Sequence, residues 1–63
     1  MKKSDYYIIN INNNGCGYIQ TETESFECSA NFAECVLNTC IRNGMTQKFF
    51  KRFENNDVQY IYN

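Results

Sequence analysis

Four cysteines are the residues of this chain that could most directly do chemistry. Cys16, Cys28, Cys35 and Cys40 are separated by eleven, six and four residues. An even number of cysteines in a chain of 63 residues is typical of a disulfide framework. Cysteine thiolates also bind zinc, but the chain has no C-x-x-C pair and no histidine to complete a mixed site.

The spacing of Cys35 and Cys40 argues against a shared metal ion. Both lie in a segment with helical periodicity, where five positions at about 100° each place them about 140° apart around the axis. No apolar leader follows Lys2 and Lys3, so we expect a reducing, cytoplasmic setting in which disulfides do not persist. We interpret the cysteines as free thiols that pack as small apolar residues, with disulfides and zinc as the alternatives.

No other group indicates catalysis. Without histidine the chain lacks the commonest general base and the usual partner of serine and cysteine nucleophiles. Glu22 and Glu24 would lie about 7 Å apart on one strand face, a separation that glycosidases use, but exposed edge glutamates more often prevent aggregation. Cys16 has no adjacent cation or base in the sequence to activate it. We expect no enzymatic activity, no cofactor and no bound metal.

The first half of the chain predicts a hairpin. Residues 5–12 alternate from Tyr7 onward and are rich in β-branched and aromatic side chains, which predicts a strand. The Asn14-Gly15 pair is a strong turn signal because both residues tolerate positive φ. The return strand is predicted over residues 17–25.

The period then changes to that of a helix. From residue 29 to 43, apolar side chains fall on a single stripe, with Cys40 in its middle and Cys35 on the polar side. Ser29 is suited to cap the N-terminus, and Gly44 can supply the left-handed residue after the last turn. These signals predict one amphipathic helix over residues 29–43.

The last third predicts a second hairpin, with strands over 45–54 and 57–62. The element order is therefore β-β-α-β-β, without a linker or repeat, and residues 1–63 are predicted to form a single domain. We expect a small two-layer α+β domain in which an antiparallel sheet of about four strands carries one amphipathic helix on one face.

A single helix leaves a sheet face uncovered. In the last strand, Val58, Tyr60 and Tyr62 share one side, and Gln59 and Ile61 share the other, so both sides carry large apolar groups. A helix of about fourteen residues, roughly 21 Å long, covers one face only. Uncovered aromatic side chains favour an interface, so we predict a homodimer joined through edge strands or through that face. The alternative is that the tyrosines lie at the rim with their hydroxyls in water.

Binding of single-stranded nucleic acid is the alternative function. The stretch Lys48–Phe53 interleaves cations with aromatic rings, a pattern that can stack bases and hold phosphates. The net charge of −1 offers a weak field for phosphates, and glycines typical of such strands are missing.

The leading hypothesis is a non-enzymatic protein-binding inhibitor. The chain is rich in Asn, Ile, Lys, Tyr and Phe, residues with AT-rich codons, and in size and style it resembles the small inhibitors that phages and mobile elements make against host defence or other host machinery. We expect it to act in the host cytoplasm, with itself and a host protein as partners and no membrane segment. The predicted partner-binding residues are Phe50, Lys51, Arg52, Tyr60 and Tyr62.

Overall fold

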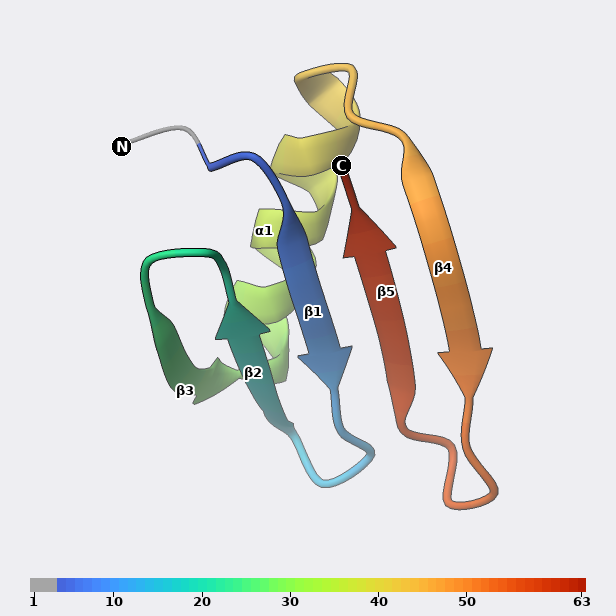
Figure 1. Cartoon of the computed structure of the whole chain (residues 1–63). Coiled ribbons are helices and arrows are strands. Elements are labelled where there is room, and N and C mark those ends of the chain that lie inside the picture. Colours follow the sequence, from blue (N-terminus) through green and yellow to red (C-terminus); the bar gives the residue numbers. More distant parts are fainter. Residues whose placement is uncertain (1–3) are drawn as a thin grey trace.

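The computed structural model describes residues 4–63 and shows one helix packed on a five-stranded antiparallel sheet (Figure 1). The elements are β1 Tyr7–Ile11, β2 Cys16–Gln20, β3 Ser25–Ser29, α1 Ala30–Arg42, β4 Gln47–Arg52 and β5 Val58–Tyr62. The sheet order is β3-β2-β1-β5-β4. The predicted α+β class is confirmed. Residues 1–3 of the predicted domain lie outside the described part of the chain.

The sheet has five strands instead of the predicted four, because residues 17–25 do not form one strand. Strand β2 ends at Gln20, and the backbone N–H of Thr21 donates to the carbonyl of Glu24 at 2.8 Å. The hydroxyl of Thr21, a buried residue, also accepts from the backbone N–H of Glu24 at 3.2 Å. A threonine side chain that bonds the local backbone favours a turn over a continued strand. The chain therefore reverses and adds β3.

Helix α1 begins and ends close to the predicted positions. The Ser29 hydroxyl accepts from the backbone N–H of Phe32 at 3.1 Å, which satisfies one of the free donors of the first turn. At the other end Gly44 has φ +78° and its N–H donates to the carbonyl of Ile41 at 3.1 Å. Glycine adopts this left-handed conformation without a Cβ penalty, so the helix stops there.

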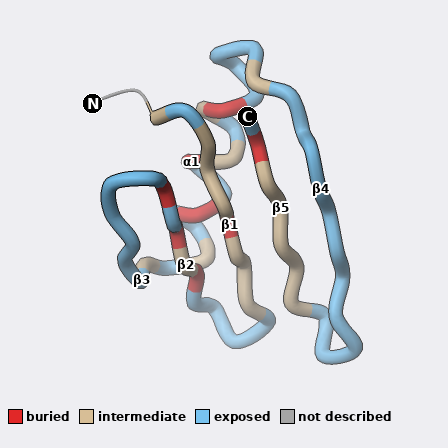
Figure 2. Tube along the Cα trace, viewed as in Figure 1, coloured by how far each residue is buried: buried red, intermediate tan, exposed pale blue. Residues whose placement is uncertain are grey.

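The core lies between α1 and the middle of the sheet. Its sheet-side members are Ile9 of β1 and Ile19 of β2, both almost fully buried, and Tyr62 at the end of β5. The helix contributes Ala33, Val36 and Cys40. Figure 2 shows buried positions on β1, β2, α1 and the end of β5, whereas β4 is exposed along its whole length. The hydrophobic contribution to stability is therefore concentrated under the helix.

Gly17 brings α1 close to β2. The position is buried, and a Cβ placed on Gly17 would lie 2.8 Å from the Cβ of Ala33. The same Cβ would also lie 3.1 Å from the backbone oxygens of Asn10 and Ser29. These two backbone oxygens cannot move aside as the end of a flexible side chain could. A residue without a side chain is thus required here for the helix to sit over β1, β2 and β3.

Strand register decides which side chains face the helix. Ile9 pairs with Ile19 on one side and with Tyr60 on the other, and Tyr60 pairs with Phe50. Directly opposed residues share a face, so this whole row lies on the helix side. The next row along β1 runs through Asn10 and faces away from the helix. The side of the sheet opposite α1 is called the open face below.

Replacement of Gly17 by Ala should destabilise the fold by about 1–3 kcal/mol, because the new methyl group overpacks against Ala33 and two backbone oxygens. Urea unfolding followed by circular dichroism measures the change. The control Ser25→Ala, at an exposed position of β3, should shift the free energy of unfolding by less than about 0.5 kcal/mol. Equal effects of the two substitutions would contradict the close-packing role of Gly17.

Candidate partner-binding surfaces

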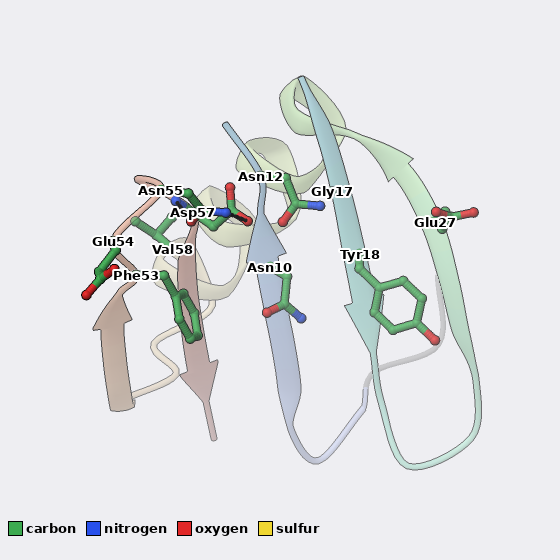
Figure 3. A pocket seen from close by; sticks show the side chains of 10 residues that line it. All are labelled: Asn10, Asn12, Gly17, Tyr18, Glu27, Phe53, Glu54, Asn55, Asp57 and Val58. Atoms are coloured by element: carbon green, nitrogen blue, oxygen red, sulfur yellow. Dashed lines mark hydrogen bonds between the residues drawn. The ribbon is translucent and has the colours of Figure 1, made fainter. Parts of the chain in front are cut away.

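The open face contains a hollow of about 710 Å³ near the two hairpin turns (Figure 3). Its lining residues come from β1, β2, β3 and β5 and from the turns between β1 and β2 and between β4 and β5. They are Asn10, Asn12, Gly17, Tyr18, Glu27, Phe53, Glu54, Asn55, Asp57 and Val58. We refer to this feature as the hollow.

The sheet register places an aromatic ring on each of two sides of the hollow. Tyr18 on β2 pairs with Asn10 on β1, so the two side chains are neighbours on the open face. Phe53 follows β4, and its backbone N–H donates to the carbonyl of Asp57 at 2.8 Å. In Figure 3 the Asn10 amide lies between the rings of Tyr18 and Phe53. The hollow thus has aromatic sides and an amide floor.

Asp57 holds the rim of the hollow in place. Its carboxylate accepts from the backbone N–H of Asn13 at 2.7 Å and from the side-chain amide of Asn55 at 3.0 Å. The Asp57 backbone N–H donates in return to the Asn55 side-chain oxygen at 3.1 Å. Asn13 belongs to the first hairpin turn and Asp57 to the second. One carboxylate therefore ties the two turns together.

The chemistry of the hollow favours a cation. Three carboxylates, from Glu27, Glu54 and Asp57, line it together with the two aromatic rings. Aromatic faces and carboxylates both attract the guanidinium of Arg or the ammonium of Lys. Amide groups such as that of Asn10 can accept and donate hydrogen bonds to a peptide backbone. The arrangement is therefore suited to a basic side chain on an exposed protein segment.

A second surface lies on the helix side, over β5 and β4. We call it the shelf and define it by Phe50, Arg52 and Tyr60. The rings of Phe50 and Tyr60 are 5.1 Å apart between centroids at an angle of 53°, a favourable tilted contact. Arg52 pairs with Val58, one row beyond the paired Phe50 and Tyr60, so Arg52 lies at one end of the shelf.

The structure divides the predicted partner-binding residues among three places. Phe50, Arg52 and Tyr60 belong to the shelf. Lys51 lies on the open face, with its Nζ 4.9 Å from the centre of the Phe53 ring. Tyr62 is buried in the core, where its hydroxyl donates to the side-chain oxygen of Gln47 at 3.1 Å. Tyr62 therefore offers little surface to a partner.

Sequence reasoning missed the hollow. Alternation of residues 17–25 placed Tyr18 on one strand face, but the neighbours of Tyr18 across the sheet depend on register. The pair Asn55-x-Asp57 was a usable local signal, because Asn and Asp side chains commonly bond the backbone two residues on. No sequence signal linked that turn to Asn13, since this contact crosses the fold.

The side chains of the stretch Lys48–Phe53 do not lie on one face of the sheet. Phe49, Lys51 and Phe53 point to the open face, whereas Phe50 and Arg52 point to the helix side. A bulge between Gln47 and Phe49 interrupts the pairing at Lys48. The interleaved cations and rings are therefore divided between the two faces, with Lys51 beside Phe53 on one and Arg52 with Phe50 on the other.

The four cysteines are free thiols with different environments. Burial raises the pKa of the Cys40 thiol above 9.0. Burial also raises the pKa of Cys28, and the neighbouring Cys16 adds to the effect. Cys35 is exposed. Within residues 4–63, no three His, Cys, Asp or Glu side chains gather so as to hold a metal ion, and no helix is long and apolar enough to span a membrane.

Thiol reactivity should follow this burial. A thiol reagent applied to the native protein should modify the exposed Cys16 and Cys35 first and Cys40 last, because Cys40 lies under the helix. All four should react at once after denaturation, without prior reduction. Mass spectrometry of timed, digested samples gives the order. Faster labelling of Cys40 than of Cys35 would contradict the observed helix phase.

Stability should fall at high pH. Burial raises the pKa of Tyr62 above 10.0, with smaller contributions from Tyr60 and Cys40, and Cys28 and Cys40 lie above 9.0. The unfolded chain therefore releases these protons at lower pH than the folded chain does. The free energy of unfolding should keep its full value below pH 9.0 and decrease as pH rises through the folded-state pKa values.

Urea titrations on both sides of this range test the pH dependence. The variant Tyr62→Phe cannot ionise at that position, so its stability should decline less steeply above pH 10.0 than that of the wild type. Parallel pH profiles for the two proteins would exclude Tyr62 as a source of the decline.

No protein-family model matches the chain, and comparisons with curated proteins and with solved structures find no match either. The hollow and the shelf are thus defined by their own residues and geometry.

Proposed function

We propose that this chain is a non-enzymatic inhibitor that binds a host protein through the open face of its sheet. It is encoded by a phage or another mobile element, acts in the host cytoplasm as a homodimer, and is directed at a protein of host defence or other host machinery. The abundance of residues with AT-rich codons and the small size support the origin. The proposed recognition element of the target is an exposed segment that carries a basic side chain.

The hollow is the observation that carries this proposal. It combines two aromatic walls, an amide floor and three carboxylates on a sheet face that no helix covers. Aromatic side chains supply much of the binding energy at protein interfaces, and complementary charges give specificity. The exposed ring of Phe53 and the half-buried ring of Tyr18 are the anchors of this surface.

The same geometry disfavours nucleic acid, the alternative function. Phosphates would meet the carboxylates of Glu27, Glu54 and Asp57 around the hollow. One face of the Phe53 ring, which a base would stack on, is approached by the Lys51 ammonium at 4.9 Å. On the open face, the single cation Lys51 of this stretch therefore lies beside the carboxylates of the hollow, a poor match to a polyanion.

Truncation of one anchor should weaken target binding. Tagged wild-type protein and Phe53→Ala are used to capture the target from host lysate, and the affinity for the captured protein is then measured. Loss of an interface anchor costs about 2 kcal/mol or more, so Phe53→Ala should bind about 30-fold more weakly. The matched control is Phe26→Ala, on the helix side of β3, since the two rings are similarly exposed at 40% and 37%.

Salt separates the two functions. A protein target should tolerate a rise from about 50 to about 200 mM salt with modest loss, whereas a nucleic acid held by several phosphate contacts should lose affinity by orders of magnitude. Binding of single-stranded oligonucleotides with that steep dependence would replace the inhibitor proposal with the alternative. A weaker target affinity for Phe26→Ala than for Phe53→Ala would place the binding surface elsewhere.

A further inference from the structure

The two outer strands of the sheet, β3 and β4, differ in how they are protected (Figure 1). Strand β4 carries three cationic side chains, and its pairing with β5 is bulged between Gln47 and Phe49. Lysines and bulges on an edge strand oppose pairing with a further strand. Strand β3 contains no lysine and no proline, and it pairs with β2 without a bulge. It is therefore the edge that can accept another strand.

The register of β3 determines which of its backbone groups point outward. The backbone N–H of Thr21 donates to the carbonyl of Glu24 at 2.8 Å, and this pair continues the register of β2 with β3. Hydrogen-bonded pairs alternate with non-hydrogen-bonded ones in an antiparallel ladder. Phe26 therefore directs its N–H and carbonyl at β2, whereas Ser25 and Glu27 direct theirs outward. Since β3 has a neighbour on one side only, these outward groups have no strand partner within the described part of the chain.

The helix side of this edge is apolar. Phe26 pairs with the buried Ile19, so its ring lies on the side of the sheet that carries α1. The ring of Phe32 in α1 contacts it, with centroids 6.2 Å apart and an angle of 59°. Phe26 is nevertheless 37% exposed and Phe32 is 46% exposed. Two uncovered rings thus lie directly beside the unpaired backbone groups.

We propose that β3 pairs antiparallel with β3 of a second copy of this chain, so that the two five-stranded sheets become one continuous sheet. A two-fold axis perpendicular to the sheet relates the copies and passes through the pair formed by Phe26 and its counterpart. Such an interface is isologous, as is usual for homodimers. The axis keeps both helices on one side of the joined sheet and both hollows on the other.

This register satisfies the outward backbone groups of both copies. With Phe26 at the axis, each Ser25 lies opposite Glu27 of the other copy, and the two residues exchange N–H to carbonyl hydrogen bonds. On the open face each Glu27 carboxylate then has a serine as its cross-strand neighbour. No like charges oppose one another across the new strand pair.

The neighbouring registers are less favourable. An axis at Glu27 would oppose two glutamates directly. An axis at Ser25 would set Glu27 against Thr23, whose backbone N–H is already bonded within the turn between β2 and β3. An axis at Cys28 would rely on Ser29, which caps α1 and whose carbonyl opens the hydrogen bonding of the helix. The charges and the helix start therefore favour Phe26 as the residue that meets itself.

The same register buries the exposed rings. The two Phe26 residues form a non-hydrogen-bonded pair, the kind in which opposed Cα atoms are closest, at about 4.5 Å, and side chains touch. Each Phe32 ring flanks this pair from its own helix. The rings of both copies then pack together in the space between the two helices, and aromatic cross-strand pairs stabilise a sheet. The second copy thus covers what the single chain leaves exposed at this edge.

The dimer rests on the proposed function, of which the homodimer is a part, and it adds how the two hollows are displayed. Both open on the same face of the joined sheet, so one assembly presents two sites for basic side chains in the same direction. Linked sites of this kind raise the overall affinity for a target that carries two such segments.

Charge substitution at the axis gives the sharpest test. Light scattering behind a sizing column should give the wild type twice the chain mass of 7.4 kDa at micromolar concentration. Phe26→Glu and Phe26→Lys should each raise the dimer dissociation constant by about tenfold or more, because each places like charges opposite one another. An equimolar mixture of the two variants should recover the dimer, since only Glu then faces Lys. Phe50→Glu is the matched control, because Phe50 is 43% exposed on the opposite edge strand, and it should leave the mass unchanged.

A second pair of variants tests the backbone contact. Ser25→Pro removes an outward N–H that the fold does not use, and proline is tolerated in an edge strand at such a position. It should weaken the dimer by about tenfold or more, whereas Ser25→Ala keeps the N–H and should dimerise as the wild type does. Circular dichroism verifies that each variant is folded.

The proposal is overturned by a wild-type mass of one chain, by Phe26 charge variants that dimerise as the wild type does, or by a mixture that stays dissociated. A dimer broken by Phe50→Glu alone would place the contact at β4. A monomeric wild type that loses its target on Ser25→Pro would assign the β3 edge to a strand of the target instead of to a second copy.

Target binding is measured separately, as the affinity of a single chain. Phe53→Ala should weaken it and keep the dimer, whereas Phe26→Glu should break the dimer and leave this affinity unchanged, because Phe26 lies on the side opposite the hollow. A monomer that still binds its target through Phe53 would remove the dimer and keep the open-face site. An intact dimer without a target would do the reverse.

Discussion

The close approach of α1 to β2 at Gly17 is the constraint on which the rest of the structure depends. With no Cβ at this position, the helix can place Ala33 directly over the strand. The helix thereby seals Ile9 and Ile19 into the core. Because one helix is narrower than a sheet of five strands, its location over β1, β2 and β3 leaves β4 and most of β5 without cover on the same side. The shelf is thus a consequence of where the helix is allowed to sit.

The alternation of strand side chains converts one edge hairpin into two unlike surfaces. Lys51 and Phe53 contribute to the open face, whereas Phe50 and Arg52, one position away from them, contribute to the shelf. The open face carries a carboxylate-rimmed hollow, and the shelf carries an aromatic pair with a guanidinium. A small domain can in this way present two surfaces of different chemistry, one on each side of its sheet. Neither surface requires a catalytic group.

In so short a chain, leaving two sheet surfaces uncovered lowers the stability of the fold. A domain of this length buries about 60% of the surface that its unfolded chain exposes, so its margin is narrow. The fully buried side chains form a single cluster under the helix, while large rings such as Phe49, Phe50 and Phe53 stay exposed. Apolar burial in the proposed homodimer would add stability where the single chain has least, so dimerisation and stability would be coupled in that assembly.

Local signals in the sequence determined the helix and both hairpins. The Ser29 cap, the Gly44 stop and the stripe through Cys40 act within a few residues, and the structure agrees with them. One local signal was misread, because the buried Thr21 hydroxyl turns the chain where the alternating pattern predicts a continued strand.

The tertiary structure alone decided strand order, register and the composition of each surface. These depend on contacts between residues far apart in the chain, such as the bond from the Asn13 N–H to the Asp57 carboxylate. A shift of register by one residue would exchange the faces of Tyr60 and Gln59, and no residue near either one encodes that choice. The packing of Ala33 on Gly17 encodes part of it. The sequence by itself therefore determined the elements, whereas long-range packing decided which side chains meet.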